Sequence, residues 1–125
     1  MSHFTQIETQ VRDIAALRAA CEELGLQVLE NAEARGYGSN RIHGDFVIRL
    51  KGPYDIALQR HTDGTYRLQA DLWAGHVERE LGNGFGRLKQ LYGVHKTTLE
   101  ARRRGLAVRR RNRADGSIRL ALCRV

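Results

Sequence analysis

Two Asp-Gly dipeptides constrain the fold of this chain most strongly, because each lies between segments in which apolar and polar residues alternate. Asp63-Gly64 precedes Tyr66–Leu72, the most regular alternation in the sequence, and Asp115-Gly116 separates segments 106–111 and 117–124. Asp-Gly favours the tight turn of a β-hairpin. Alternation indicates strands with one buried and one solvated face. The sequence therefore predicts an antiparallel sheet with at least two hairpins.

In two other segments, apolar residues recur at the three- and four-residue spacing of amphipathic helices. The first helix is expected at about 14–24, where Asp13 can cap its start and Gly25 can end it. The second is expected from Phe85 to about Arg104, with a stop at Gly105. Each helix would bury one apolar stripe against the sheet.

The remaining strands complete the predicted order of elements. They are expected at residues 4–11, 26–30, 46–50 and 54–59. The stretch 31–44 has little pattern, and its centre, Arg35–Asn40, is a loop by composition. The order is then β-α-β-β-β-β-α-β-β. It predicts an α+β fold in which two helices pack on one face of an antiparallel sheet of about six to seven strands.

The length of 125 residues fits a single domain, 1–125, and is too short for two. The sequence has no apolar run close to the ~20 residues of a membrane helix, and its first residues lack a signal layout. Cys21 and Cys123 are interpreted as small core residues rather than as a disulfide framework. We therefore expect a cytoplasmic protein with no membrane contact.

The net charge of +7 comes from the end of the chain. Residues 1–100 hold 12 Lys and Arg against 13 Asp and Glu, whereas residues 101–125 hold nine Arg against one acidic residue. The planar guanidinium of arginine pairs two oxygens at once, which suits an anionic partner. Solubility and helix capping are the alternative explanation, because three of these arginines close the second helix.

The last predicted hairpin would place part of this charge on one face. Leu106 and Val108 would face the helices, while neighbouring arginines point outward. Trp73, the single tryptophan, follows the most regular strand and is a candidate partner contact, with packing at the sheet rim as the alternative. The candidate partner- or anion-binding residues are Arg109, Arg111, Arg113, Arg119 and Trp73.

No set of residues has the spacing of a catalytic or metal site. The five histidines are at least 15 residues apart, so no two would share a helical turn or a loop as metal ligands. The glycines of 82–86 precede a helix, but they do not follow a buried parallel strand and no Gly-Lys-Ser/Thr ends the loop. A flexible helix entry is therefore favoured over a phosphate site. We expect no metal, no cofactor and no catalytic residues.

Several short segments, weak singly and specific as a set, resemble an uncharacterised family. They are Met1–Thr5 with Ile7 and Thr9, Arg35-Gly36-Tyr37, Asp45–Arg49, Tyr54-Asp55-Ile56, Leu68–Asp71 with Trp73, Tyr92-x-x-His95-Lys96, and Asp115–Leu120. The family is a domain of unknown function found in cyanobacteria, in some algal plastid genomes as a hypothetical reading frame, and in scattered other bacteria. The resemblance implies a cytosolic or stromal protein with no assigned reaction, and it suggests a ring-forming ATPase as a partner. Arg109-Arg110-Arg111 departs from the family pattern.

These observations favour a small non-enzymatic interaction module, an adaptor or accessory subunit of a larger cytosolic assembly. A nucleic-acid-binding domain that uses the C-terminal arginine hairpin is the first alternative. The aromatic fraction of 6% argues against it, because single-strand binders stack bases on aromatic rings. The second alternative is an enzyme with an unrecognised site, although no acid, base and nucleophile converge in the pattern.

Overall fold

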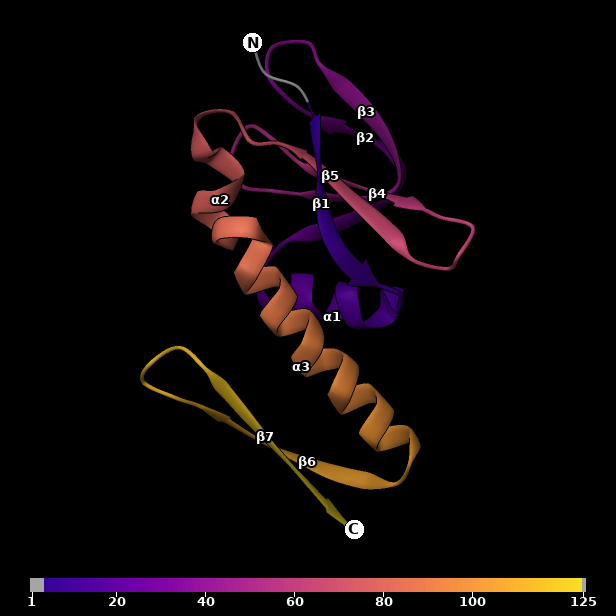
Figure 1. Cartoon of the computed structure of the whole chain (residues 1–125), viewed down its shortest axis with the longest axis vertical. Helices are drawn as coiled ribbons and strands as arrows, with labels where there is room; N and C mark the ends of the chain where they lie inside the picture. The colour runs from indigo at the N-terminus through magenta and orange to yellow at the C-terminus, as the bar shows by residue number, and fades with distance from the viewer. Residues whose placement is uncertain (1–3, 125) are drawn as a thin grey trace.

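Seven strands form two separate antiparallel sheets in the computed structural model, which describes residues 4–124 (Figure 1). The larger sheet has the order β1-β5-β4-β3-β2. Its strands are β1 (Phe4–Val11), β2 (Gln27–Arg35), β3 (Arg41–Arg49), β4 (Ile56–Arg60) and β5 (Tyr66–Asp71). The last two strands, β6 (Leu106–Asn112) and β7 (Ile118–Arg124), pair with each other. The predicted α+β class and antiparallel pairing are confirmed.

The helices are α1 (Ile14–Glu23), α2 (His76–Leu81) and α3 (Gly86–Arg103). The Asp13 carboxylate accepts a hydrogen bond from the Ala16 amide at 3.1 Å, so it caps α1 as predicted. Short 3₁₀ turns at Trp73–Gly75 and Asn83–Phe85 lead into α2 and α3. The two long helices are confirmed, and α2 is an additional short one. None of the helices in residues 4–124 is long and apolar enough to cross a membrane.

The loop predicted at Arg35–Asn40 is confirmed for residues 36–40, which form the turn between β2 and β3. The rest of the stretch 31–44 belongs to these two strands, which pair along their whole length and extend further than the sequence pattern indicated. Asn31 lies in the middle of β2 with a φ of 49°. Val28, before it, packs in the main core, whereas Ala34, after it, packs in a second cluster on the other face of the sheet. A strand that changes its buried face has no continuous alternation of apolar and polar residues, so its sequence shows little strand pattern.

The main core lies between one face of the larger sheet and the helices. Its fully buried side chains include Ile48, Ile56 and Leu68 from the strands, and Leu17 and Leu88 from α1 and α3. These apolar positions belong to the stripes that the helical and strand periodicities predicted. The helices therefore cover one face of the sheet, as expected.

The turn between β2 and β3 reaches back across the opposite face. β1 and β2 are at opposite edges of the sheet, yet Gly36, just after β2, packs against Phe4 of β1 and Asp71 of β5. A Cβ at position 36 would lie 2.9 Å from the Phe4 ring, so this close approach requires glycine. The bent hairpin thus covers the second cluster, which contains Ala34 and Val47.

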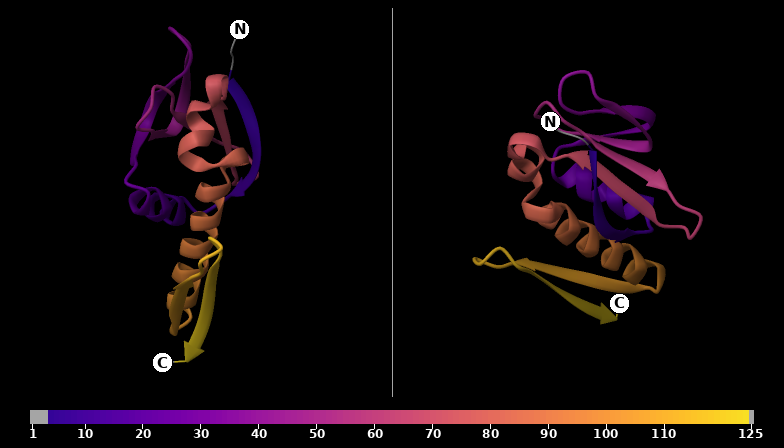
Figure 2. Two further views of the ribbon diagram at one scale, coloured as in Figure 1. Left: turned by 90° about the vertical axis from the view of Figure 1, so that its left-hand side faces the viewer. Right: turned by 45° about the horizontal axis from the view of Figure 1, so that its top comes forward.

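Helix α3 separates the terminal hairpin from the larger sheet (Figure 2). Its 18 residues span about 27 Å at 1.5 Å per residue. The hairpin then runs back along α3, where the Gln90 side-chain amide donates to the Gly116 carbonyl at 2.9 Å. The seven strands are consequently divided into a sheet of five and a hairpin of two.

The two Asp-Gly turns have the same local structure. The Asp63 carboxylate accepts from the amide and the hydroxyl of Thr65, and the glycine between them has a φ of 86°. The Asp115 carboxylate accepts the same two bonds from Ser117, and the intervening glycine has a φ of 89°. These hydrogen bonds lower the pKa of both aspartates. Both hairpins predicted from Asp-Gly are confirmed.

Leu17→Ala and Leu88→Ala should each lower the free energy of unfolding by about 2–5 kcal/mol, because truncating a fully buried leucine leaves a cavity. Urea unfolding followed by circular dichroism measures the loss. Lys89→Ala, exposed on α3 beside Leu88, is the matched control and should cost less than about 0.5 kcal/mol. Equally small losses for both leucine variants would contradict the placement of these helix faces in the core.

Candidate functional site

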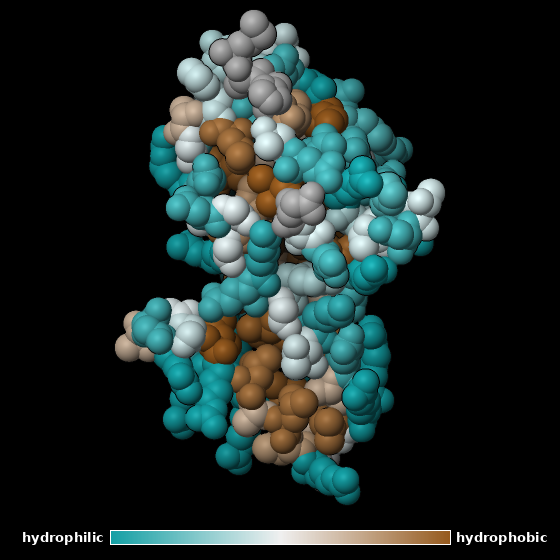
Figure 3. All heavy atoms as spheres, viewed as in Figure 1, coloured by the Kyte–Doolittle hydropathy of each residue, from teal (hydrophilic) through white to brown (hydrophobic). Residues whose placement is uncertain are grey.

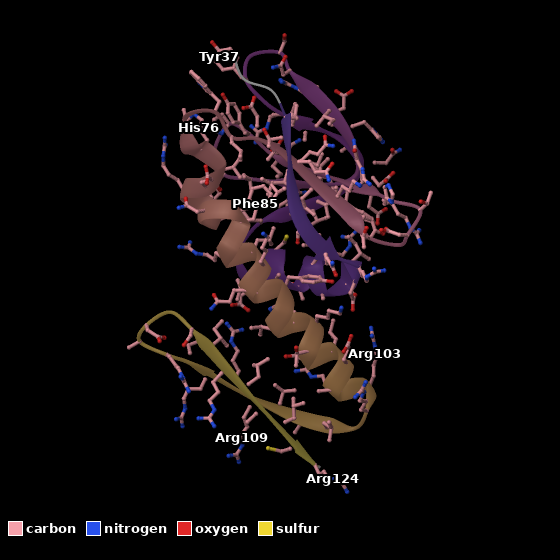
Figure 4. The ribbon with its side chains drawn as sticks, in the orientation of Figure 1. Tyr37, His76, Phe85, Arg103, Arg109 and Arg124 are labelled. Carbon is pink, nitrogen blue, oxygen red and sulfur yellow. The ribbon has the colours of Figure 1, made fainter. Side chains whose placement is uncertain are left out.

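The terminal hairpin has two chemically different faces. Directly opposed residues in its register point to the same side, so Val108 shares one face with Leu122, and Arg111 shares the other with Arg119. The first face is turned toward α3. Figure 4 shows Arg109 on the side of the hairpin away from α3. The outward and inward faces therefore follow the predicted alternation.

Arg109, Arg111 and Arg119 make up the arginine face. All three side chains are exposed, and with Arg110 and Ala121 they line a hollow of about 510 Å³. Among the side chains that the structure describes, none forms a salt bridge with any of the three. Their guanidinium groups are thus available to an external anion.

Val108, Leu120 and Leu122 make up the apolar strip on the face toward α3. Leu122 is 52% exposed, and the other two are partly exposed. Figure 3 shows hydrophobic surface over the hairpin and the adjoining part of α3, bordered on both sides by hydrophilic residues. An apolar surface with a charged rim is typical of an interaction site.

Arg110 fastens the hairpin to the helices. Its Nη1 and Nη2 donate to the two carboxylate oxygens of Glu23 in α1, at 2.7 and 2.8 Å. His95 Nε2 of α3 lies 2.8 Å from Glu23 Oε1. The hydrogen bond from Arg110, together with the contact of His95, lowers the pKa of Glu23 to about 2. The same ion pair raises the pKa of Arg110.

The other C-terminal arginines have different settings. Arg113 is exposed at the hairpin turn, where its amide donates to the Ser117 carbonyl at 2.8 Å. Arg102 and Arg103 form the last turn of α3, and Arg103 Nη2 is 4.0 Å from Asp13. A cation at a helix C-terminus is favourable, so helix capping accounts for these two arginines.

Trp73 lies at the opposite end of the molecule from the arginine face. Its side chain is 49% exposed, and its ring meets that of Tyr37 edge to face, with centroids 5.8 Å apart. Figure 4 shows Tyr37 at the top of the molecule and Arg109 near the bottom. The five candidate residues therefore do not form one site. The sequence pattern missed Tyr37, because only the bent β2–β3 turn brings it to Trp73.

Asp71 holds the two loops that carry this aromatic pair. Its carboxylate accepts from the amides of Tyr37 and Trp73, at 2.9 and 3.0 Å. The alternation of β5 predicts a solvated Asp71, but the residue is fully buried because the β2–β3 turn covers it. Nearby, the Tyr54 and His76 rings meet edge to face at 5.0 Å. Burial raises the pKa of Tyr54, and the Asp71 carboxylate adds to this effect.

Asp55 and Arg35 form a bidentate ion pair beneath these loops. Arg35 Nε and Nη2 each donate to one carboxylate oxygen at 2.8 Å. Asp55 is fully buried and also accepts from the amides of Arg35 and Leu50, at 3.0 and 3.2 Å. Burial alone would raise the pKa of Asp55, but the bonds from Arg35 outweigh it and lower the pKa. The contact raises the pKa of Arg35.

The described residues offer little for metal or nucleophile chemistry. In the part of the chain whose side chains are described, no three His, Cys, Asp or Glu residues gather as metal ligands. Cys21 is buried in α1, and burial raises its pKa to about 12, so its thiol stays protonated. In the glycine-rich loop, the amides of Gly82 and Phe85 donate to backbone carbonyls. The loop thus serves as the entry to α3.

The fold and its surface define a small α+β protein with a basic hairpin set apart from the main sheet. The chain belongs to the DUF1257 family, described as a protein of unknown function, whose model matches residues 20–121. It is 30% identical over 126 residues to the uncharacterized protein ycf35 of Pyropia yezoensis, covering 99% of this chain and 98% of that protein. No solved structure matches. The resemblance inferred from the sequence is confirmed.

The Glu23–Arg110 contact should make the stability of the protein depend on pH. The pKa of Glu23 is lowered from 4.5 to about 2 in the folded state. Its contribution is therefore fully present above pH 4.5 and is lost as the pH falls toward 2. Urea unfolding of the wild type and Glu23→Gln should show an advantage for the wild type at pH 6 that shrinks steadily by pH 3. Glu22→Gln, exposed beside it, is the control, and a pH-independent advantage would contradict the assignment.

Asp55→Asn should lower the free energy of unfolding by about 3 kcal/mol, because it removes one partner of a buried ion pair. Since the folded pKa of Asp55 is below its ordinary value of 3.8, its contribution is present above that pH and is lost in acid. Chemical unfolding at pH 7 measures the loss. Glu33→Gln, exposed on β2, is the matched control, and equal stabilities of the two variants would refute a structural role for the pair.

Proposed function

We propose that this protein is a non-enzymatic interaction module, an adaptor or accessory subunit of a larger cytosolic assembly, and that its terminal hairpin binds an acidic protein partner. One observation carries the proposal: one face of the hairpin has three arginines that form no ion pair with any described side chain, and the opposite face has a half-exposed apolar strip. The hairpin that carries both faces stands apart from the main sheet. A surface of this kind offers both charge complementarity and apolar anchors.

The charge distribution supports an acidic partner. Residues 106–124 hold six arginines and one aspartate, whereas the chain up to the end of α3, residues 1–103, is close to neutral. The Glu23 carboxylate neutralises Arg110 within the molecule, which leaves the arginine face to an external group. Because this clamp also fixes the hairpin on α1 and α3, the backbone that carries the arginine face is positioned before binding, which lowers the cost of ordering it on association.

A ring-forming ATPase, the partner that the family resemblance suggests, is one assembly that such an accessory subunit would suit. Binding of nucleic acid is the second candidate function, favoured by the same three unpaired arginines, since guanidinium groups also pair with phosphates. The hairpin itself carries no aromatic ring for base stacking, and the exposed Tyr37 and Trp73 lie at the far end of the molecule. A protein partner is therefore the better fit.

The proposal is tested by affinity capture from a lysate of the source cells, treated with nuclease and untreated. The bait is compared with a triple variant, Arg109→Ala, Arg111→Ala and Arg119→Ala. A partner should be captured from both lysates, and its affinity, measured with the purified partner, should fall at least tenfold for the triple variant. The matched control removes the same charge elsewhere, as Arg49→Ala, Arg60→Ala and Arg102→Ala, all exposed, and should keep the affinity.

Two results would count against the proposal. Equal affinity of both triple variants for the partner would show that the arginine face of the hairpin does not bind it. Loss of capture after nuclease treatment would favour nucleic acid, and titration with mixed nucleic acid should then give a log-affinity against log-salt slope of about −2 to −3 for three contacts.

A further inference from the structure

We propose that the acidic partner binds as an added β-strand along the free edge of β7, and that the bound segment alternates acidic and apolar residues. This inference rests on the proposed function, because it specifies how the hairpin would recognise an acidic protein. It is carried by the hydrogen-bond pattern of the hairpin and by the different chemistry of its two faces.

The backbone of β7 is open on one side. Within residues 4–124, β7 pairs only with β6. The Arg113 amide donates to the Ser117 carbonyl, and hydrogen-bonded pairs recur at every second position of an antiparallel ladder. The pair Arg111↔Arg119 is therefore hydrogen-bonded, whereas the backbone groups of Leu120 and Leu122 point away from β6. An incoming strand would find unpaired donors and acceptors at these positions.

This edge is more regular than the edges of the larger sheet. Edge β1 has a register irregularity between Ile7 and Val11, and edge β2 contains Asn31 in the left-handed region. Such irregularities protect an edge against pairing with another chain. The β6–β7 ladder runs from Leu106 to Asn112 without a shift. The edges of the hairpin are consequently better suited to strand addition than those of the larger sheet, and the β7 edge is the one that carries Leu120 and Leu122.

The two faces of the hairpin dictate the sequence of the added strand. Successive side chains of a strand point to opposite faces. On the face toward α3 they would lie beside Leu120 and Leu122, which favours apolar residues. On the other face they would lie beside Arg119 and within reach of Arg109 and Arg111, which favours carboxylates. A strand that satisfies both faces has to alternate between the two types.

Charge excludes a second copy of this chain as the preferred occupant. A β7 strand from another molecule would bring Arg119 and its neighbours onto the same arginine face, and like charges on adjacent strands are destabilising. An acidic segment reverses the sign of this interaction. The occupant is therefore a segment of a different, acidic protein.

The test uses two end-blocked, fluorescently labelled peptides of identical composition. Glu-Val-Glu-Leu-Glu-Val-Glu alternates, and Glu-Glu-Val-Leu-Val-Glu-Glu clusters its apolar residues. Anisotropy titrations against the full chain should show at least tenfold tighter binding of the alternating peptide. Leu122→Ser should weaken its binding at least fivefold, whereas Ala114→Ser, exposed at the turn, should leave it unchanged.

N-methylated peptides test the added strand directly. Backbone amides of an added strand point alternately toward β7 and toward solvent. Methylation of one set of amides, either all those of Glu or all those of Val and Leu, should abolish binding. Methylation of the other set should change the affinity less than threefold relative to the unmethylated peptide. Equal effects of both sets would overturn strand addition.

The remaining outcomes are equally decisive. Equal affinities of the alternating and clustered peptides would show that charge alone attracts the acidic segment. That result would overturn strand addition, while the proposed function would stand. The absence of binding by either peptide at low salt would also remove strand addition, and the proposed function would then depend on the capture experiment alone. A dimer seen by sedimentation without peptide, and abolished by Leu122→Ser, would assign the edge to a second copy and overturn the proposal.

Discussion

The bidentate bond between Arg35 and the buried Asp55 carboxylate is the contact on which the shape of the larger sheet depends. It joins the end of β2 to the segment between β3 and β4, and the Asp55 amide donates back to the Arg35 carbonyl at 3.0 Å. A charge buried without a partner is costly, so the buried Asp55 carboxylate keeps the end of β2 next to the segment between β3 and β4. This contact fixes the bend of the β2–β3 hairpin. The bend then brings the β2–β3 turn over the face opposite the helices, where Gly36 packs on Phe4.

A second buried carboxylate extends this arrangement to the surface. The Asp71 carboxylate accepts hydrogen bonds from the backbone amides of Tyr37 and Trp73, so a buried group positions the two residues of the exposed aromatic pair. The chain after Trp73 passes through Ala74 and Gly75 with φ of 57° and 71°, and only then enters α2. Left-handed backbone at Ala74 is unfavourable and persists because its surroundings fix it. The backbone that carries the aromatic pair is thus held by hydrogen bonds to a buried group.

At the other end, α3 and the Glu23 clamp give the hairpin its position. An isolated two-stranded hairpin is marginally stable in water. Here Ile118 packs against the main core and Arg110 bonds to Glu23, so the hairpin gains support from both α1 and α3. Because that support comes through one face only, the arginine face and one strand edge are left open. The rest of the molecule thereby holds in place the surface to which we attribute partner binding.

Local pattern determined most of the elements and the order in which they follow one another, except for α2 and the full length of β2 and β3. Alternation and Asp-Gly dipeptides located the hairpins, periodicity with Asp13 and Gly25 located α1, and charge counting located the arginine-rich hairpin, because each signal acts within a few residues. Tertiary structure alone decided the bend of β2, the burial of Asp71, the contact of Tyr37 with Trp73, and the separation of the hairpin from the sheet. These depend on contacts between residues far apart in the chain, such as Arg110 with Glu23, whose partners no local spacing can identify.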